Sequence, residues 1–235
     1  MLYRSLTTVA FSVISLFAMA QNDVTRTTYY TEPGSYGTKR ESDPPNYVRD
    51  LKALGFSGVH QVDWINIGLD TRNRTEYRQN DIRRAPTFSE DVPVLFKSRA
   101  YFGFEERFGF LGATAEFQDS RRYNSQFAID NRDWNPMTFI QAYGELKFKS
   151  ILPRDPRGNY RPVLIRGGRM TFEFLDRRLI ALNQWRNTSN NFLGTRISIG
   201  QDANDWQFDL LILHPISRLV DSLETTSDFD TTRTD

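Results

Sequence analysis

The chain has 235 residues, no cysteine and a formal net charge of +1, and 14% of its residues are aromatic. The near-neutral charge gives no bulk attraction to nucleic acid, and the lack of cysteine excludes a lipoprotein and a disulfide-stapled secreted domain. After the N-terminus, no apolar stretch reaches the roughly 20 residues that a transmembrane helix needs. The remaining classes are a water-soluble domain and a membrane protein that spans the bilayer with strands.

Residues 1–20 are typical of a secretory signal peptide. A positive residue, an apolar run and a small-x-small cleavage site follow one another as Arg4, Leu6 to Phe17 and Ala18-Met19-Ala20. An uncleaved N-terminal anchor is the alternative, but the apolar run is too short to span a bilayer as a helix. Export of a chain without cysteine indicates a bacterial envelope protein.

The rest of the chain divides into three parts. Residues 21–60 show no periodicity and are interpreted as a periplasmic leader or loop, in which residues 47–54 could form a short helix. Residues 61–218 carry repeated strand patterns, and residues 219–235 form a Ser/Thr/Asp-rich tail that we expect to be disordered.

Seven strands are predicted from side chains that alternate between apolar and charged. They run over about Trp64 to Asn80, Val94 to Phe108, Phe110 to Arg121, Thr138 to Lys149, Tyr160 to Phe174, Phe192 to Gln201 and Trp206 to Ile216. In the second strand Phe102 and Phe104 share one face and Arg99 lies on the other. The pair Gly167-Gly168 suggests a β-bulge in the fifth strand.

The strand lengths favour a membrane barrel. The strands have about ten to fifteen residues, against five or six in ordinary sheets, and a tilted membrane strand needs about nine to eleven. Short turns at 109 and 202–205 alternate with long loops at 80–93, 122–136 and 176–191. The predicted fold is therefore all-β, an antiparallel transmembrane β-barrel of the bacterial outer membrane, in contact with lipid and lipopolysaccharide. A soluble sandwich does not explain such long strands with Phe on one face and Arg on the other.

Ordered motifs between Trp64 and Pro215 resemble the alginate export family of outer-membrane β-barrels. They are Ile165-Arg-Gly-Gly-Arg169, Arg178-Leu-Ile-Ala181, Trp185-Arg-Asn-Thr188 and Phe192-Leu-Gly-Thr-Arg196, with the strand pieces 116–121 and 140–143 before them. Leu193 stands where the family commonly has Asp, and Ala181 replaces a Gly. The resemblance implies a non-enzymatic channel for anionic, alginate-like polysaccharide, with periplasmic export or assembly factors as further partners.

The number of strands is small for this family. The chain shows about seven candidate strands and ends in Thr-Thr-Arg-Thr-Asp rather than in the aromatic residue usual for outer-membrane barrels. We interpret it as the N-terminal part of a larger barrel. A complete barrel of about eight strands is the alternative.

The candidate lumen residues are those that could meet a carboxylate polymer. They are Arg72, Arg74, Arg99, Arg166, Arg169, Arg196, Glu116 and Tyr143. Arginine carries a permanent charge and pairs with carboxylates in two-point geometry, and acidic neighbours would keep the binding reversible. The alternative role for each arginine is a structural salt bridge between neighbouring strands.

The sequence gives little support to catalysis. Its two histidines, His60 and His214, have no serine or carboxylate in a recognisable arrangement, and the loop carboxylates select neither a catalytic pair nor a metal site. We predict a channel that needs no cofactor or metal. The alternatives are a general porin with an unrelated substrate and, less favoured, an outer-membrane enzyme.

Overall fold

The computed structural model describes residues 41–55, 58–80, 90–105, 109–173, 180–183, 185–201 and 203–217. The predicted signal peptide, residues 21–40 and the predicted tail lie outside the described residues. The strands are β1 (Val48–Asp50), β2 (Ile65–Thr75), β3 (Arg78–Gln79), β4 (Glu90–Asp91), β5 (Val94–Phe104), β6 (Leu111–Tyr123), β7 (Asn135–Phe148), β8 (Val163–Met170), β9 (Phe192–Ile199) and β10 (Phe208–Pro215).

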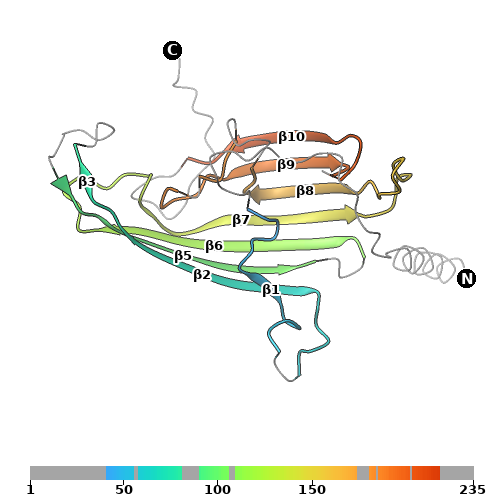
Figure 1. Cartoon of the computed structure of the whole chain (residues 1–235), viewed down its shortest axis with the longest axis horizontal. Coiled ribbons are helices and arrows are strands. Elements are labelled where there is room, and N and C mark those ends of the chain that lie inside the picture. The colour runs from blue at the N-terminus through green and yellow to red at the C-terminus, as the bar shows by residue number, and fades with distance from the viewer. Residues whose placement is uncertain are drawn as a thin grey trace, which may run out of the picture.

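Eight of these strands form one antiparallel sheet in the order β1-β2-β5-β6-β7-β8-β9-β10, and β3 pairs with β4 alone (Figure 1). The described residues contain no helix, so the all-β, antiparallel prediction is confirmed. β1 and β10 form the two edges of the sheet. A search of the described residues for a helix long and apolar enough to cross a membrane found none.

The seven predicted strands correspond to β2 and β5 to β10, with two corrections in the N-terminal half. The first strand ends at Thr75, and the residues beyond Tyr77 form the short pair β3–β4. The short helix considered for residues 47–54 is wrong, because Val48 pairs with Gly68 as part of β1 and a turn follows. An eight-residue helix forms few hydrogen bonds to offset the free-energy cost of its first turn. The backbone of residues 48–50 can instead form hydrogen bonds with the edge of β2.

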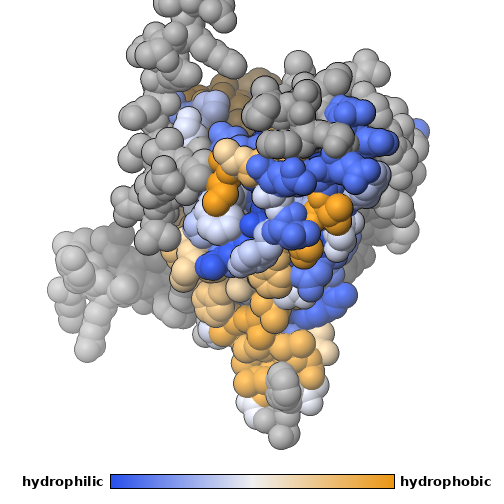
Figure 2. All heavy atoms as spheres, turned by 90° about the vertical axis from the view of Figure 1, so that its left-hand side faces the viewer, coloured by the Kyte–Doolittle hydropathy of each residue, from blue (hydrophilic) through white to orange (hydrophobic). Residues whose placement is uncertain are grey.

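One face of the sheet carries a continuous apolar row. The strand register places Leu111, Leu146, Ile165, Ile197 and Leu210 side by side across five neighbouring strands. Further along this face Leu69 is 71% exposed and Phe102 is 54% exposed. Seen from the end of the sheet that carries β3, hydrophobic residues gather in the lower part of the surface and hydrophilic residues in the upper part (Figure 2).

The opposite face is polar and buried. Lys97 and Arg166 are each 4% exposed there, and Glu116 is 1% exposed. We call it the polar face. Exposed apolar rows and buried charges are the reverse of the arrangement in water-soluble domains, where charged side chains are rarely buried.

The bulge predicted at Gly167-Gly168 is wrong. Pairing of β8 with both neighbours is continuous through these residues, and the register shifts lie instead between β6 and β7, at 116/117 and 118/120. Gly168 lies directly opposite Gly194, and both have positive φ, 129° and 155°. A Cβ on Gly194 would lie 2.0 Å from the carbonyl oxygen of Ile212. The glycines therefore allow a close backbone approach without an inserted residue.

Gly194→Ala is expected to lower the free energy of unfolding by about 3 kcal/mol, because the new Cβ meets backbone and the positive φ strains an alanine. The matched control is Gly144→Ala, since a Cβ there has no atom within 4 Å. Urea unfolding in detergent micelles, followed by tryptophan fluorescence, measures both. Equal midpoints for the two variants would contradict this account of Gly194.

Candidate functional site on the polar face

The side-chain alternation of six strands brings most candidate residues to the polar face. The cross-strand pairs Glu145–Arg166 and Arg166–Arg196 form one polar row across three strands. Arg72, Arg99 and Glu116 come to the same face from β2, β5 and β6. Two segments far apart in the sequence cover this face, residues 41–47 and residues 185–191.

Residues 41–47, which we call the strap, cross the sheet before entering β1 (Figure 1). Glu41 forms an ion pair with Arg99 at 3.0 Å, and Asp43 pairs with Arg166 at 2.8 Å. The hydroxyl of Tyr47 donates a hydrogen bond to Glu116. The strap thus places two carboxylates on Arg99 and Arg166, which we predicted from the sequence to contact a transported polyanion.

The sheet supplies further carboxylates to the same arginines. Arg99 also pairs with Asp70 at 3.0 Å and lies 3.6 Å from Glu116. Arg166 pairs with Glu145 at 2.7 Å, and its guanidinium lies 4.0 Å from the ring centre of Tyr143. Glu116 and Glu145 are largely shielded from water, whereas the side chain of Asp70 is 35% exposed.

We call this middle zone the charge belt. Its cations are Lys97, Arg99 and Arg166, and its carboxylates are Asp70, Glu116, Glu145, Glu41 and Asp43. Three cations against five carboxylates leave a formal charge of about −2. Without the two carboxylates of the strap the belt would be neutral.

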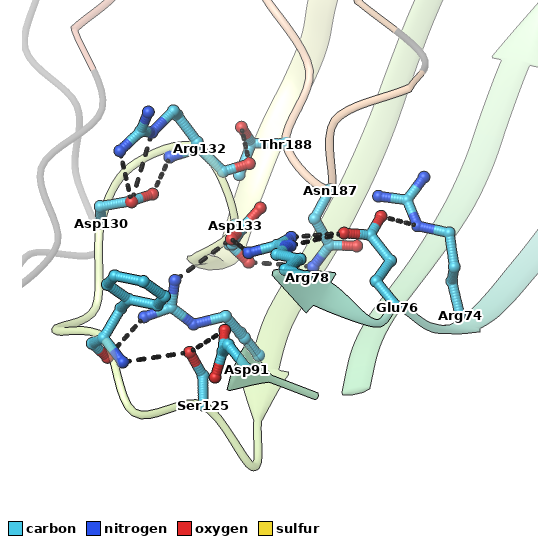
Figure 3. A network of polar contacts seen from close by, with 12 residues as sticks. Arg74, Glu76, Arg78, Asp91, Ser125, Asp130, Arg132, Asp133, Asn187 and Thr188 are labelled. Carbon is cyan, nitrogen blue, oxygen red and sulfur yellow. Dashed lines mark hydrogen bonds and ion pairs between the residues drawn. The ribbon is translucent and has the colours of Figure 1, made fainter. Parts of the chain in front are cut away.

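Residues 185–191, which we call the inner loop, fold down onto the polar face of β5 and β6. The side-chain nitrogen of Asn187 lies 3.0, 3.0 and 2.9 Å from the carbonyl oxygens of Phe96, Arg121 and Asp133. The Thr188 hydroxyl lies 3.0 Å from the Arg132 carbonyl oxygen (Figure 3). Asn187 and Thr188 are fully buried, so these bonds replace the hydration of several backbone groups.

The inner loop also forms side-chain hydrogen bonds to β5 and β6. The Ser189 hydroxyl donates to Gln118 Oε1 at 2.8 Å and accepts from Lys97 Nζ at 2.9 Å. These groups are all buried. The residue that follows the Trp-Xaa-Asn-Thr motif, Ser189, therefore attaches the inner loop to β5 and β6 by hydrogen bonds.

Arg72 and Arg74 hold the first residues of the inner loop through its backbone. Arg72 Nη2 donates to the carbonyl oxygen of Arg186 at 2.8 Å, and Arg74 Nη1 donates to that of Trp185 at 2.6 Å. The Arg74 guanidinium lies 4.6 Å from the Trp185 ring centre. These two candidate arginines therefore position a loop as well as contributing charge.

A chain of ion pairs extends from this point to residues 124–134, the loop between β6 and β7 (Figure 3). Glu76 lies 2.6 Å from both Arg74 and Arg78. Asp133 lies 3.5 Å from Arg78 and 3.2 Å from Arg122. The network joins the end of β2 to the end of β6 and fixes the long-loop end of the sheet.

The remaining candidate arginines lie on β8 and β9. Arg196 is directly opposite Arg166 on the neighbouring strand. Each of these two arginines pairs with an acid from the strand on its other side, Arg166 with Glu145 and Arg196 with Asp209 at 3.2 Å. Arg169 Nη2 lies 3.2 Å from the Thr138 hydroxyl. Salt bridges between neighbouring strands, the alternative role considered for each arginine, are present for Arg99, Arg166 and Arg196.

At the short-turn end, Asp155 joins two neighbouring turns. Its carboxylate accepts hydrogen bonds from the side chains of Asn204 at 2.9 Å and Asn159 at 3.0 Å, and from two backbone N–H groups. Desolvation alone would raise the pKa of Asp155, but these hydrogen bonds outweigh it and hold the pKa below its ordinary value.

A depressed pKa in the folded state means that Asp155 stabilises the fold above its unfolded pKa of about 3.9 and that this contribution is lost as pH falls through the folded pKa. We expect Asp155→Asn to be less stable than the wild type at pH 7, with the difference shrinking as pH falls below about 4. Urea midpoints between pH 2 and pH 7 measure this. A difference that stays constant with pH would contradict it.

The histidines do not converge on a site. His214 pairs with Leu193 inside the sheet, and His60 lies in the turn before β2. Within the described ranges, no group of three His, Cys, Asp or Glu residues is placed to hold a metal ion.

Comparison with known families matches residues 63–234 to alginate export proteins. The chain belongs to the alginate export family. This is a family of outer-membrane proteins that export alginate-like polysaccharide, and its activity is transport rather than catalysis. Comparisons with curated proteins and with solved structures gave no match.

The motifs of this alginate export protein acquire a structural meaning. The Ile165–Arg169 and Phe192–Arg196 pieces pair with each other in β8 and β9, and the Trp185–Thr188 piece begins the inner loop. Sequence reasoning did not find the strap or the inward fold of the loop. The signal available was the two acids and the tyrosine of residues 41–47, which lie in a segment without periodicity.

Proposed function

We propose that this protein is an outer-membrane channel whose polar face lines a lumen that passes alginate-like anionic polysaccharide or small anions. The proposed lining residues are Arg72, Arg74, Arg99, Arg166, Arg169, Arg196, Glu116 and Tyr143. The observation that carries the proposal is the distribution of side chains over the two faces of the sheet. The apolar row on one face includes the exposed Ile165 and Leu210, whereas Lys97, Glu116 and Arg166 are buried on the other face. In a barrel wall the first face contacts lipid and lipopolysaccharide and the second contacts water.

The sheet edges call for additional pairing. β1 and β10 bound the described sheet, and each unsatisfied backbone group in lipid costs several kcal/mol. We propose that further strands complete the barrel. The chain would then supply one curved wall of the lumen.

The charge along the polar face is uneven, and this supports anion capture at one end. We call the long-loop end the rim. Its cations are Arg72, Arg74, Arg78, Arg122, Arg132 and Arg186, and its carboxylates are Glu76, Glu90, Asp91, Asp130 and Asp133. Six cations against five carboxylates leave about +1, whereas the charge belt carries about −2. A narrow, low-dielectric passage focuses such a field on a polyanion.

Single-channel recording in planar bilayers tests this proposal. We expect an acidic oligouronate to block the current more than a neutral oligosaccharide of equal length, with the difference falling at 1 M salt because the Debye length shrinks to about 3 Å. A cation-selective channel that both sugars block equally would contradict it.

A general porin is the second candidate, and the ion pairing of Arg99 and Arg166 with the chain's own carboxylates favours it. A general porin would show anion selectivity for chloride and no dependence of the block on oligouronate length. A polysaccharide conduit should bind longer oligomers more tightly, because successive carboxylates engage the same wall.

A further inference from the structure

Trp185 is the most exposed of the large hydrophobic side chains described by the structure, with 74% of its surface accessible. It does not lie on the apolar face. Its indole is next to Arg74, a residue of the polar face, at 4.6 Å from ring centre to guanidinium. Because Trp185 lies in a polar, arginine-rich environment, contact with lipid does not explain its exposure.

The backbone beneath this indole is held firmly. Arg74 and Arg72 bind the carbonyl oxygens of Trp185 and Arg186, and the next residue, Asn187, is fully buried and bonded to three carbonyl oxygens. A side chain on an immobilised backbone loses little conformational entropy when it binds a ligand. Trp185 is therefore a preorganised contact surface.

The surroundings define the chemistry of a ligand for this surface. The arginines Arg72, Arg74 and Arg186 gather around Trp185, and Arg186, directly after it, is itself exposed. A flat apolar ring beside guanidinium groups complements a pyranose, which has one face of C–H groups, when that sugar also bears a carboxylate. Neutral sugars would use the ring alone, and small anions the charge alone.

We propose that Trp185 and Arg186 form a binding site for one hexuronate unit of an anionic polysaccharide, with the sugar ring stacked on the indole and its carboxylate paired with the guanidinium. The proposal rests on the proposed channel function and adds to it a defined site at the rim. In this proposal the rim binds the incoming polysaccharide, and the polysaccharide then passes the charge belt, where the strap already supplies carboxylates to the arginines.

Trp206 provides a matched control within the same chain. Its ring also lies beside an arginine, Arg161 at 5.2 Å, and it is 47% exposed. Arg161, however, pairs with Asp205 at 2.7 Å, and both residues lie at the short-turn end of the sheet. An indole–guanidinium contact that is neutralised in this way should not capture a uronate.

The experiment records single-channel block by a hexameric oligogalacturonate, using the full protein in planar bilayers. Trp185→Ala should raise the concentration for half-block by about tenfold, Trp185→Phe should restore most of the affinity, and Trp206→Ala should leave it unchanged. Arg186→Gln should weaken the block by the acidic hexamer and leave that by a neutral hexamer of the same length unaltered.

The outcomes separate this site from the channel function. If Trp185→Ala is blocked as tightly as the wild type while the channel stays anion-selective, the Trp185 site is refuted and the channel function stands. A wild-type channel that is cation-selective and indifferent to oligogalacturonate refutes both. Equal weakening by Trp185→Ala and Trp206→Ala would also refute the site, because it would show a general effect of removing an indole.

Discussion

Asn187→Ala is expected to lower the free energy of unfolding by about 3 kcal/mol and to release the inner loop. Its buried side-chain nitrogen contacts three backbone carbonyl oxygens from β5, β6 and the loop 124–134, and alanine leaves all three without that donor. Urea unfolding in detergent measures the stability, and limited proteolysis near Trp185 reports release of the loop.

Asn73→Ala is the control for this change, since Asn73 lies on the opposite, exposed face of β2. It should move the urea midpoint little, because exposed substitutions usually change stability by less than about 0.5 kcal/mol. If Asn187→Ala behaves like Asn73→Ala, the inner loop is not anchored by this side chain.

Neutralising the strap is expected to increase anion-over-cation permeability severalfold. Glu41→Gln with Asp43→Asn removes two negative charges from the charge belt, and the amides keep the size of the side chains on Arg99 and Arg166. In a low-dielectric passage these charges act with little screening at about 0.1 M salt. Reversal potentials across a KCl gradient give the permeability ratio.

The control for the strap variant removes the same number of negative charges at positions that do not lie on the polar face. Glu90→Gln with Asp205→Asn removes two exposed carboxylates at β4 and at the short-turn end. Its permeability ratio should stay close to that of the wild type. An unchanged ratio in the strap variant would show that the strap does not lie in the conducting path.

The period of two in the sequence predicted the strands and their faces well. Within β5, Phe102 was placed opposite Arg99, and the structure exposes the first and pairs the second with acids. Such alternation is local, because each strand residue reveals its face from its immediate neighbours. The seven long strands therefore followed from the sequence alone.

What covers the polar face could not be predicted in this way. Glu41 and Arg99 are 58 residues apart, and Ser189 and Lys97 are 92 residues apart. Neither the strap nor the inner loop has a periodic pattern, since their side chains bind backbone carbonyls and charges of distant strands. The prediction of a bulge at Gly167-Gly168 was wrong for a related reason. Gly168 lies opposite Gly194 on the next strand, and the local sequence does not reveal that pairing.

The central claim is that the aliphatic face contacts lipid and the polar face contacts water. Because the chain has no cysteine, single cysteines can be introduced without background. In the protein reconstituted in lipid vesicles, a membrane-impermeant maleimide should label Arg72→Cys and Arg196→Cys and should leave Leu69→Cys and Phe102→Cys unlabelled. Labelling of the second pair with protection of the first would contradict the account, because a shift of one residue reverses every side chain in the sheet.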